Sequence, residues 1–158
     1  SKTLCVAEVK AYTPYVRNTS DPGGSYPAGS PPADPAIVAG LASGGDAKVG
    51  TTTNDNTGHT EWPDGRVHHS GFTATFPPNT RVPFTRNGVE YDIDYNSRQE
   101  GNSATVRTFA AITARSYHNG TVNAARLDGS VHAIADGTDP AVWRALATRA
   151  DGEAVAVP

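Results

Sequence analysis

The chain has 158 residues, a formal net charge of −3 and a single cysteine, Cys5. A nearly neutral, slightly acidic balance gives no basic surface for nucleic-acid phosphates, so partners of that class are not expected. One cysteine excludes an intramolecular disulfide, and no segment approaches the roughly 20 apolar residues needed to cross a bilayer. The length suits a single globular domain over residues 1–158.

The first element expected is a strand at Leu4–Val9, a short apolar run of strand length in which Cys5 is predicted to lie in the core. Glu8 interrupts it, either as an edge-facing or arginine-paired carboxylate near the strand end or as a ligand or hydrogen-bond acceptor facing the histidine-rich region. The Pro-, Gly- and Ser-rich stretch 19–35 predicts an exposed loop. Asp34-Pro35 then predicts the start of a short helix over Ala36–Ala42.

The chemically densest part of the chain is 51–70. His59 and Glu61 share a face if this part is a strand, Asp64-Gly65 would turn the chain, and His68 or His69 would return beside them. Such donors suit Zn²⁺ or another transition metal, so the candidate metal ligands are His59, Glu61 and His68. The spacing matches no standard zinc motif, and a hydrogen-bonded network that orders a loop is the alternative.

Two further features of this region bear on ligands. Residues 54–58 faintly resemble a calcium loop without fitting its pattern, which makes Ca²⁺ a second candidate ion. Trp62, followed by a proline, is predicted to cap the core, with stacking on a carbohydrate as the alternative.

The segments after residue 70 favour strands. Prolines in 72–84 exclude a central strand. Residues 89–95 alternate as a half-buried strand or an extended arm. Their acidic side, with Glu90, Asp92 and Asp94, is predicted to be solvated, with a second cation site as the alternative. Residues 105–115 form the longest strand candidate, covered on both faces. His118 follows it and is expected to lock the next loop by hydrogen bonds to the backbone.

The best-defined local pattern runs from Arg115 to Glu153. Asp128-Gly129 between two short strand-like segments predicts a hairpin with a type I′ turn. Asp139 as N-cap and Pro140 in the first turn predict a helix, with Trp143 on its apolar side and Gly152 as its stop.

Three separated motifs resemble one known family. They are His118 and Asp128-Gly129 with nine residues between them, the tail 141–149, and the central run Gly58-His59-Thr60-Glu61-Trp62 with Asp64-Gly65-Arg66-Val67-His68, continued by Gly71-Phe72-Thr73 and Pro77-Pro78-Asn79-Thr80. They resemble the H-x9-D-G signature and flanking motifs of the planctomycete prepilin-like proteins, which are similar to type II secretion pseudopilins and carry a domain of otherwise unknown function. The resemblance implies a basic leader and an apolar helix upstream of the globular part. This chain is expected to start inside the globular part.

The fold expected is α+β, a pseudopilin-like head with one antiparallel sheet, long loop insertions and a short C-terminal helix. The sheet segments are Leu4–Val9, Val106–Arg115, Val122–Leu127 and Ser130–Ile134, and the helix packs through Val142, Trp143 and Leu146.

The function expected is a non-catalytic interaction module, periplasmic or at the cell surface, whose partners are other pilin-like subunits or secretion components. Its only membrane contact would be the upstream helix, and this part alone should be monomeric or weakly associating. The alternatives are a metal-dependent hydrolase using the 59–69 cluster, with Asp64 or Glu8 as base, and a carbohydrate- or matrix-binding surface.

Overall fold

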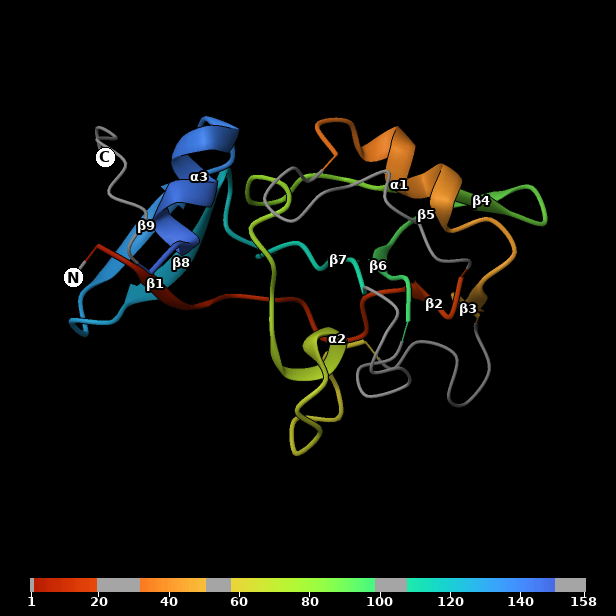
Figure 1. Ribbon diagram of the computed structural model, residues 1–158, viewed down its shortest axis with the longest axis horizontal. Coiled ribbons are helices and arrows are strands. Elements are labelled where there is room, and N and C mark those ends of the chain that lie inside the picture. The colour runs from red at the N-terminus through yellow and green to blue at the C-terminus, as the bar shows by residue number, and fades with distance from the viewer. Residues whose placement is uncertain (1, 20–31, 51–57, 99–107, 150–158) are drawn as a thin grey trace.

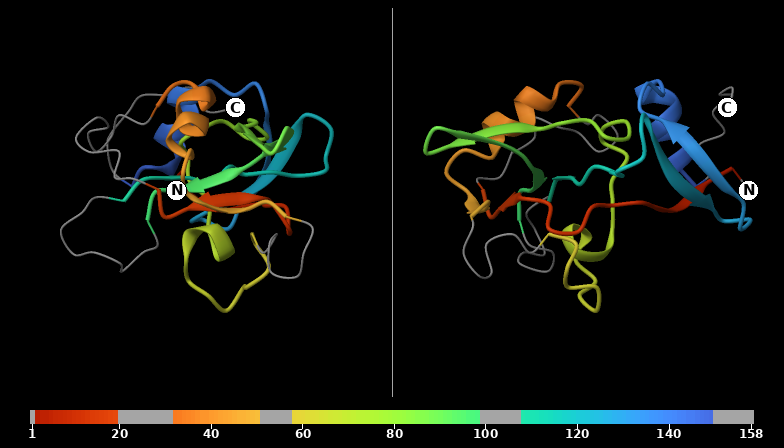
Figure 2. Two further views of the ribbon diagram at one scale, coloured as in Figure 1. Left: turned by 90° about the vertical axis from the view of Figure 1, so that its right-hand side faces the viewer. Right: turned by 180° about the vertical axis from the view of Figure 1, so that it is seen from behind.

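The computed structural model describes residues 2–19, 32–50, 58–98 and 108–149. It shows an α+β protein whose elements lie in two lobes, with short helices and mainly antiparallel sheets (Figure 1). The first lobe contains β1 (Leu4–Ala7), β8 (Thr121–Arg126), β9 (Val131–Ala135) and α3 (Pro140–Ala147). The second contains α1 (Pro35–Leu41), β2 (Tyr15–Arg17), β3 (Asp46–Lys48), β4 (Pro83–Arg86), β5 (Val89–Asp92), β6 (Asp94–Asn96) and β7 (Ala110–Ala111). The short helix α2 (Val67–Ser70) and the loop before it protrude from the molecule in every view (Figures 1 and 2).

The sheet of the first lobe is antiparallel, in the order β1-β8-β9. Its hairpin forms where the sequence predicts it, but the turn is of another type. Of the Asp-Gly pair only Gly129 has a positive φ, of 82°, whereas a type I′ turn needs two such residues. Asp128 holds the turn instead, because its Oδ1 accepts hydrogen bonds from the backbone N–H and the hydroxyl of Ser130.

Helix α3 confirms the prediction for its start and for its apolar side. Asp139 accepts hydrogen bonds from the N–H groups of Ala141 and Val142, and Pro140 opens the helix. Trp143 and Leu146 are buried, and the core of this lobe comprises Leu4, Ala114, Val122, Ala124, Ile134, Trp143 and Leu146. The helix ends at Ala147, and Gly152 lies outside the described residues.

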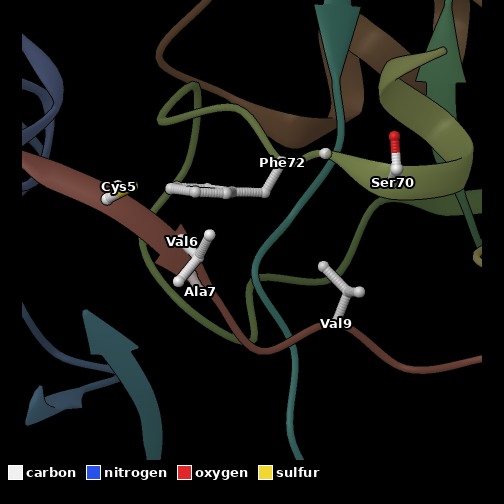
Figure 3. A pocket seen from close by; sticks show the side chains of 7 residues that line it. Cys5, Val6, Ala7, Val9, Ser70 and Phe72 are labelled. Carbon is white, nitrogen blue, oxygen red and sulfur yellow. The ribbon is translucent and has the colours of Figure 1, made fainter. Parts of the chain in front are cut away.

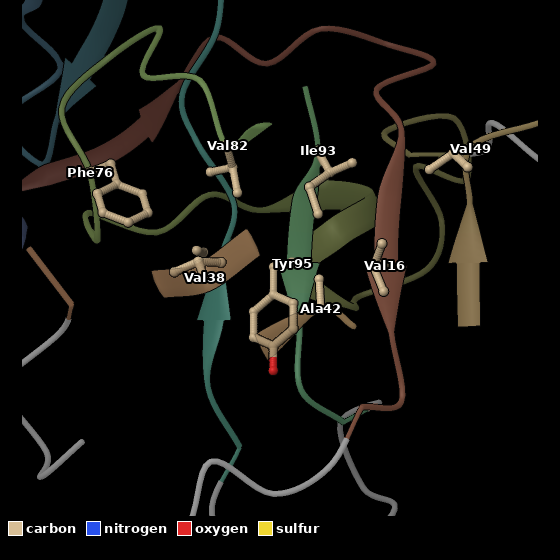
Figure 4. Close-up of a cluster of buried hydrophobic side chains, with 9 residues drawn as sticks. Val16, Val38, Ala42, Val49, Phe76, Val82, Ile93 and Tyr95 are labelled. Carbon is tan, nitrogen blue, oxygen red and sulfur yellow. The ribbon is translucent and has the colours of Figure 1, made fainter. Parts of the chain in front are cut away.

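The second lobe is built on a four-stranded sheet in the order β3-β2-β6-β7, in which β2 and β6 are parallel and the other pairs antiparallel. Its core draws side chains from α1, β2, β6 and the loops around them (Figure 4). The hairpin β4–β5 turns at Asn87-Gly88, where both residues have positive φ, as a type I′ turn requires. The helix predicted over residues 36–42 is α1, capped by the Asp34 side chain.

The prediction of one long strand over residues 105–115 is wrong. Of residues 105–115 only Ala110–Ala111 form a strand, and this strand pairs with β6 in the second lobe and not with the β1-β8-β9 sheet; residues 105–107 lie outside the described part. The reason is that the backbone after it bonds to several different segments: Thr73 N–H donates to Ile112, Asn79 N–H to Ala114, and Arg115 N–H to Glu8. The strand predicted over residues 89–95 is confirmed except at Ile93, where it divides into β5 and β6, which belong to different sheets.

Three passages of the described chain lie between the lobes: those after β1 and after β7 run from one lobe to the other, and the one after α2 leads to β4 (Figure 1). The bonds of Thr73, Asn79 and Arg115 run between these passages, so they tie the lobes together. None of the helices in the described segments is both long and apolar enough to cross a bilayer. The assignment of one domain to residues 1–158 stays a prediction.

Candidate functional site

A buried cluster of charged side chains lies where the three passages meet the second lobe. Asp94 at the start of β6 is 1% exposed, and its Oδ1 accepts hydrogen bonds from Arg115 Nη1 and from the N–H of Thr113. Its Oδ2 lies 3.1 Å from Nε2 of His59. Arg115 also donates to Oδ1 of Asp92 at 3.0 Å, so one guanidinium joins two carboxylates. We call His59, Asp92, Asp94 and Arg115 the Asp94 cluster.

The charges of the Asp94 cluster stabilise each other. Burial alone would raise the pKa of Asp94, but the positive charge of Arg115 and the hydrogen bond from His59 outweigh it, so this pKa is lowered. Burial likewise opposes the charge of Arg115, whereas Asp94 and Asp92 raise its pKa. The acidic side of residues 89–95 was predicted to be solvated, and for Asp94 that prediction is wrong. A carboxylate at this depth needs such partners, because an unpaired buried charge is costly.

Beside this cluster, helix α2 buries two adjacent histidines. His68 and His69 have ring centroids 4.3 Å apart, and Tyr15 of β2 lies 4.8 Å from His68. Nδ1 of His68 lies 3.4 Å from the side-chain nitrogen of Asn96. The rings therefore form a packed stack between α2 and the sheet of the second lobe.

Glu61, Asp64 and His69 are brought together at the end of the protruding loop. One ligand atom from each lies within 4.8 Å of the others, and the three could hold a metal ion. Asp64 also accepts hydrogen bonds from the backbone N–H and the side chain of Arg66. The backbone hydrogen bond from Arg66, helped by its positive charge, lowers the pKa of Asp64. We call these three residues the 61–69 group.

Of the three predicted metal ligands, only Glu61 belongs to this group. His59 is directed to Asp94 and His68 to Asn96, while His69, the neighbour of His68, supplies the imidazole. The strand expected to align His59 with Glu61 does not form, because His59 has a φ of 57° and a turn follows it. Asp64-Gly65 does belong to the turn that precedes α2. The calcium-like residues 54–57 lie outside the described part.

His118 and Glu8 form a second polar group with Asn123, which we call the Glu8 cluster. Glu8 accepts hydrogen bonds from the N–H of Asn123 at 2.7 Å and from its side-chain amide at 3.0 Å, and Nε2 of His118 lies 3.2 Å from Oε1. These bonds, mainly the backbone one, lower the pKa of Glu8 although burial opposes the shift. His118 thus fastens the chain through side chains and not, as predicted, through the backbone.

Asn79 is a connecting residue that the sequence did not single out as such. Its Oδ1 accepts from the N–H of Ser116, and its Nδ2 donates to Asp136 at 2.7 Å and to the carbonyl of Thr121 at 3.4 Å. The signal available was its place in the Pro77-Pro78-Asn79-Thr80 motif. Arg115 was missed because it ends what looked like a regular strand.

Trp62 and Cys5 are both more exposed than predicted. Trp62 is 82% exposed, so it does not cap the core. Cys5 is exposed and lies on β1, because the apolar run that contains it has only one side against the core. A shallow pocket lies here, where Phe72 faces Val6 and Ala7 from the loop after α2, with Val9 and Ser70 at its other end (Figure 3). Cys5 is the sole titratable residue of its lining among the described residues, and neither polar cluster opens into it.

No protein-family model matches the chain, and no curated protein or solved structure matches it either.

Proposed function

We propose that this chain is the globular head of a pseudopilin-like subunit, a non-catalytic interaction module outside the cytoplasmic membrane. The observation that carries the proposal is the use of the family-like motif residues within the fold. His118 contacts Glu8 and lies 3.2 Å from the Asn123 amide, Asp128 and Gly129 form the hairpin turn, and the buried Trp143 packs in the core. These motif residues stabilise the fold itself, as expected of a motif whose role is structural.

The charged groups support a scaffold over an enzyme. The hydrolase alternative relies on Asp64 or Glu8 as the base, and both have lowered pKa values. Arg66 engages Asp64, and Asn123 and His118 engage Glu8, so each carboxylate is already used as a hydrogen-bond acceptor. A general base works best with a pKa near the working pH, which lowered values disfavour. A divalent cation, zinc or calcium, would in this proposal stabilise the loops without turning over a substrate.

In this proposal an apolar helix upstream anchors the head in the membrane, and the partners are other pilin-like subunits or secretion components. The test is to express the complete subunit in a bacterial host with a prepilin peptidase. We expect a basic leader that is cleaved, a following segment of about 20 apolar residues, and a head that protease reaches in spheroplasts. Pilin-like subunits should co-purify in detergent only while the apolar helix is present.

The proposal also predicts a head that is monomeric or weakly associating by sedimentation. A complete subunit without such a helix, or a head reached by protease only after cell lysis, would refute it. So would a tight oligomer of the head alone.

The exposure of Trp62 favours one second candidate, a carbohydrate- or matrix-binding surface. Exposed aromatic rings can stack on sugar faces, and Trp62 is exposed in the loop before α2. Retention of the head on immobilised bacterial polysaccharide, lost in Trp62→Ala and kept in Trp143→Phe, would support it. Equal retention of the Trp62→Ala variant would exclude it.

A further inference from the structure

We propose that Glu61, Asp64 and His69 bind one zinc-class ion, which fastens the protruding loop to helix α2. The inference does not depend on the pseudopilin proposal, because it rests on the geometry of these three side chains.

The first step is the fit of the ligand atoms. Nε2 of His69 lies 3.6 Å from Oε2 of Glu61, and one ligand atom from each of the three residues lies within 4.8 Å of the others. Zinc ligands at 2.0–2.2 Å in a tetrahedron are about 3.4 Å apart, so the His69–Glu61 spacing already approaches the bound one. The Glu61 side chain is 52% exposed and can rotate to close the remaining gap.

The second step is the state of His69. Its side chain is 2% exposed, its Nδ1 has no hydrogen-bond partner in the described part of the chain, and Nε2 is beyond hydrogen-bonding distance of Glu61. In the neutral ring with its proton on Nδ1, the lone pair of Nε2 faces a carboxylate, which is also an acceptor. A cation between Nε2 of His69 and the Glu61 carboxylate gives both of these acceptors a partner, and an acceptor buried without one costs stability.

The ring is also held in place before any ion arrives. Its backbone N–H donates to the carbonyl of Arg66, its ring lies against His68, and Tyr15 meets it edge-on at 6.1 Å. Ligation by a ring fixed in this way costs little side-chain entropy.

The third step is the choice of ion. An imidazole nitrogen beside two carboxylates suits zinc, whereas calcium and magnesium prefer oxygen ligands alone. Glu61 and Asp64 place two carboxylates beside the single positive charge of Arg66, whose Nη1 lies 2.6 Å from Oδ2 of Asp64. The group therefore carries a net negative charge, and three protein ligands leave one position for water.

The experiment uses the untagged chain, dialysed against chelator and titrated with ZnCl2, CoCl2 and CaCl2 by calorimetry. We expect one zinc per chain, confirmed by elemental analysis after gel filtration, and no displacement of zinc by calcium. Bound cobalt should show the visible absorption of a nitrogen- and oxygen-ligated site and quench the fluorescence of Trp62, which lies between the ligands Glu61 and Asp64. Trp62→Phe should remove most of that quenching, because the second tryptophan, Trp143, lies in the core of the first lobe.

Two variants and two matched controls decide the assignment. Glu61→Gln and His69→Gln should each weaken zinc binding by at least about tenfold, on the scale of effects at metal sites. Glu90→Gln and His132→Gln, which change the same residue types elsewhere, should bind as the wild type does. Because Glu61 is half exposed, its variant should keep the circular dichroism of the parent, which separates ligand loss from unfolding. Absence of zinc binding, or unchanged binding in a folded Glu61→Gln variant, would overturn the proposal.

Discussion

Asp94 and Arg115 face each other in the interior as an ion pair, with Asp94 1% and Arg115 4% exposed. The pair joins β6 to the passage that follows β7, and Arg115 N–H reaches on to Glu8 beyond β1. One residue thus bonds to the charges of the second lobe through its side chain and to the passage after β1 through its backbone.

Replacing Arg115 by methionine keeps most of the volume and removes the charge. We expect a loss of about 3–5 kcal/mol in the free energy of unfolding, because Asp94 is left buried without its main counter-charge. Urea unfolding measures it, and the matched control is Arg81→Met, whose partner Glu90 is exposed and whose loss should be below about 1 kcal/mol. The double variant Asp94→Asn with Arg115→Met should be less destabilised than the sum of the singles. Additive effects would contradict the pairing.

The pKa of Asp94 predicts how stability depends on pH. It is lower in the folded protein than the usual value of about 3.9, so the unfolded chain takes up the proton first as the pH falls. The stabilisation is therefore complete above about pH 4 and is lost as the pH drops further toward the folded pKa. The pKa values of Glu8 and Asp46 are also lowered in the folded protein, so these two groups likewise lose their contribution to stability as the pH falls. Urea midpoints measured between about pH 7 and pH 3 should fall at the acid end, and less steeply in Asp94→Asn; parallel curves would count against this.

Asn79→Ala should destabilise the connection between the lobes. The change removes the bonds to Ser116 and Asp136 and leaves buried groups without partners, at a cost of about 2–4 kcal/mol. Asn79 also has a positive φ, which itself costs alanine about 1 kcal/mol. Asn87→Ala is the control, because Asn87 has a similar φ in an exposed hairpin turn, so the difference between the two variants reports the side-chain bonds. Equal losses in thermal or urea unfolding would show that those bonds contribute nothing.

Glu8 should contribute more than His118 to the protection of Asn123, on the central strand β8 of the β1-β8-β9 sheet. Glu8→Ala removes the acceptor for both the backbone and the side-chain N–H of Asn123, whereas His118→Ala leaves these bonds in place. We therefore expect hydrogen exchange at the Asn123 amide to accelerate in Glu8→Ala and to change little in His118→Ala. The reverse order would mean that His118, and not Glu8, holds the strand.

Local chemistry explains what was predictable in the fold. The hairpin at Asp128-Gly129 and the start of α3 depend on a few adjacent residues, namely a glycine with positive φ and an N-cap before a proline. The Asn87-Gly88 hairpin was predictable from the same kind of signal. The turn type at Asp128 was not, because the Ser130 hydroxyl and N–H hold its carboxylate in a different conformation.

The sequence could not predict which distant residues each side chain contacts in the fold. Asp92 and Asp94 alternate with apolar neighbours as a solvated strand does, yet the chain changes sheets at Ile93 and buries Asp94 against an arginine distant in sequence. The same limit applies to the candidate site. Adjacent histidines on a short helix point to different partners, so only the fold distinguishes His69 from His68.

The two sets of buried apolar residues, one in each lobe, have no member in common. Coupling between the unfolding of the two lobes must therefore pass through the connecting passages, which are joined by the backbone hydrogen bonds of Thr73, Asn79 and Arg115. We expect one half to lose its order before the other, with a calorimetric enthalpy larger than the van't Hoff value. A ligand that contacted both lobes would make their unfolding more cooperative, because its binding would stabilise only the state in which both are folded.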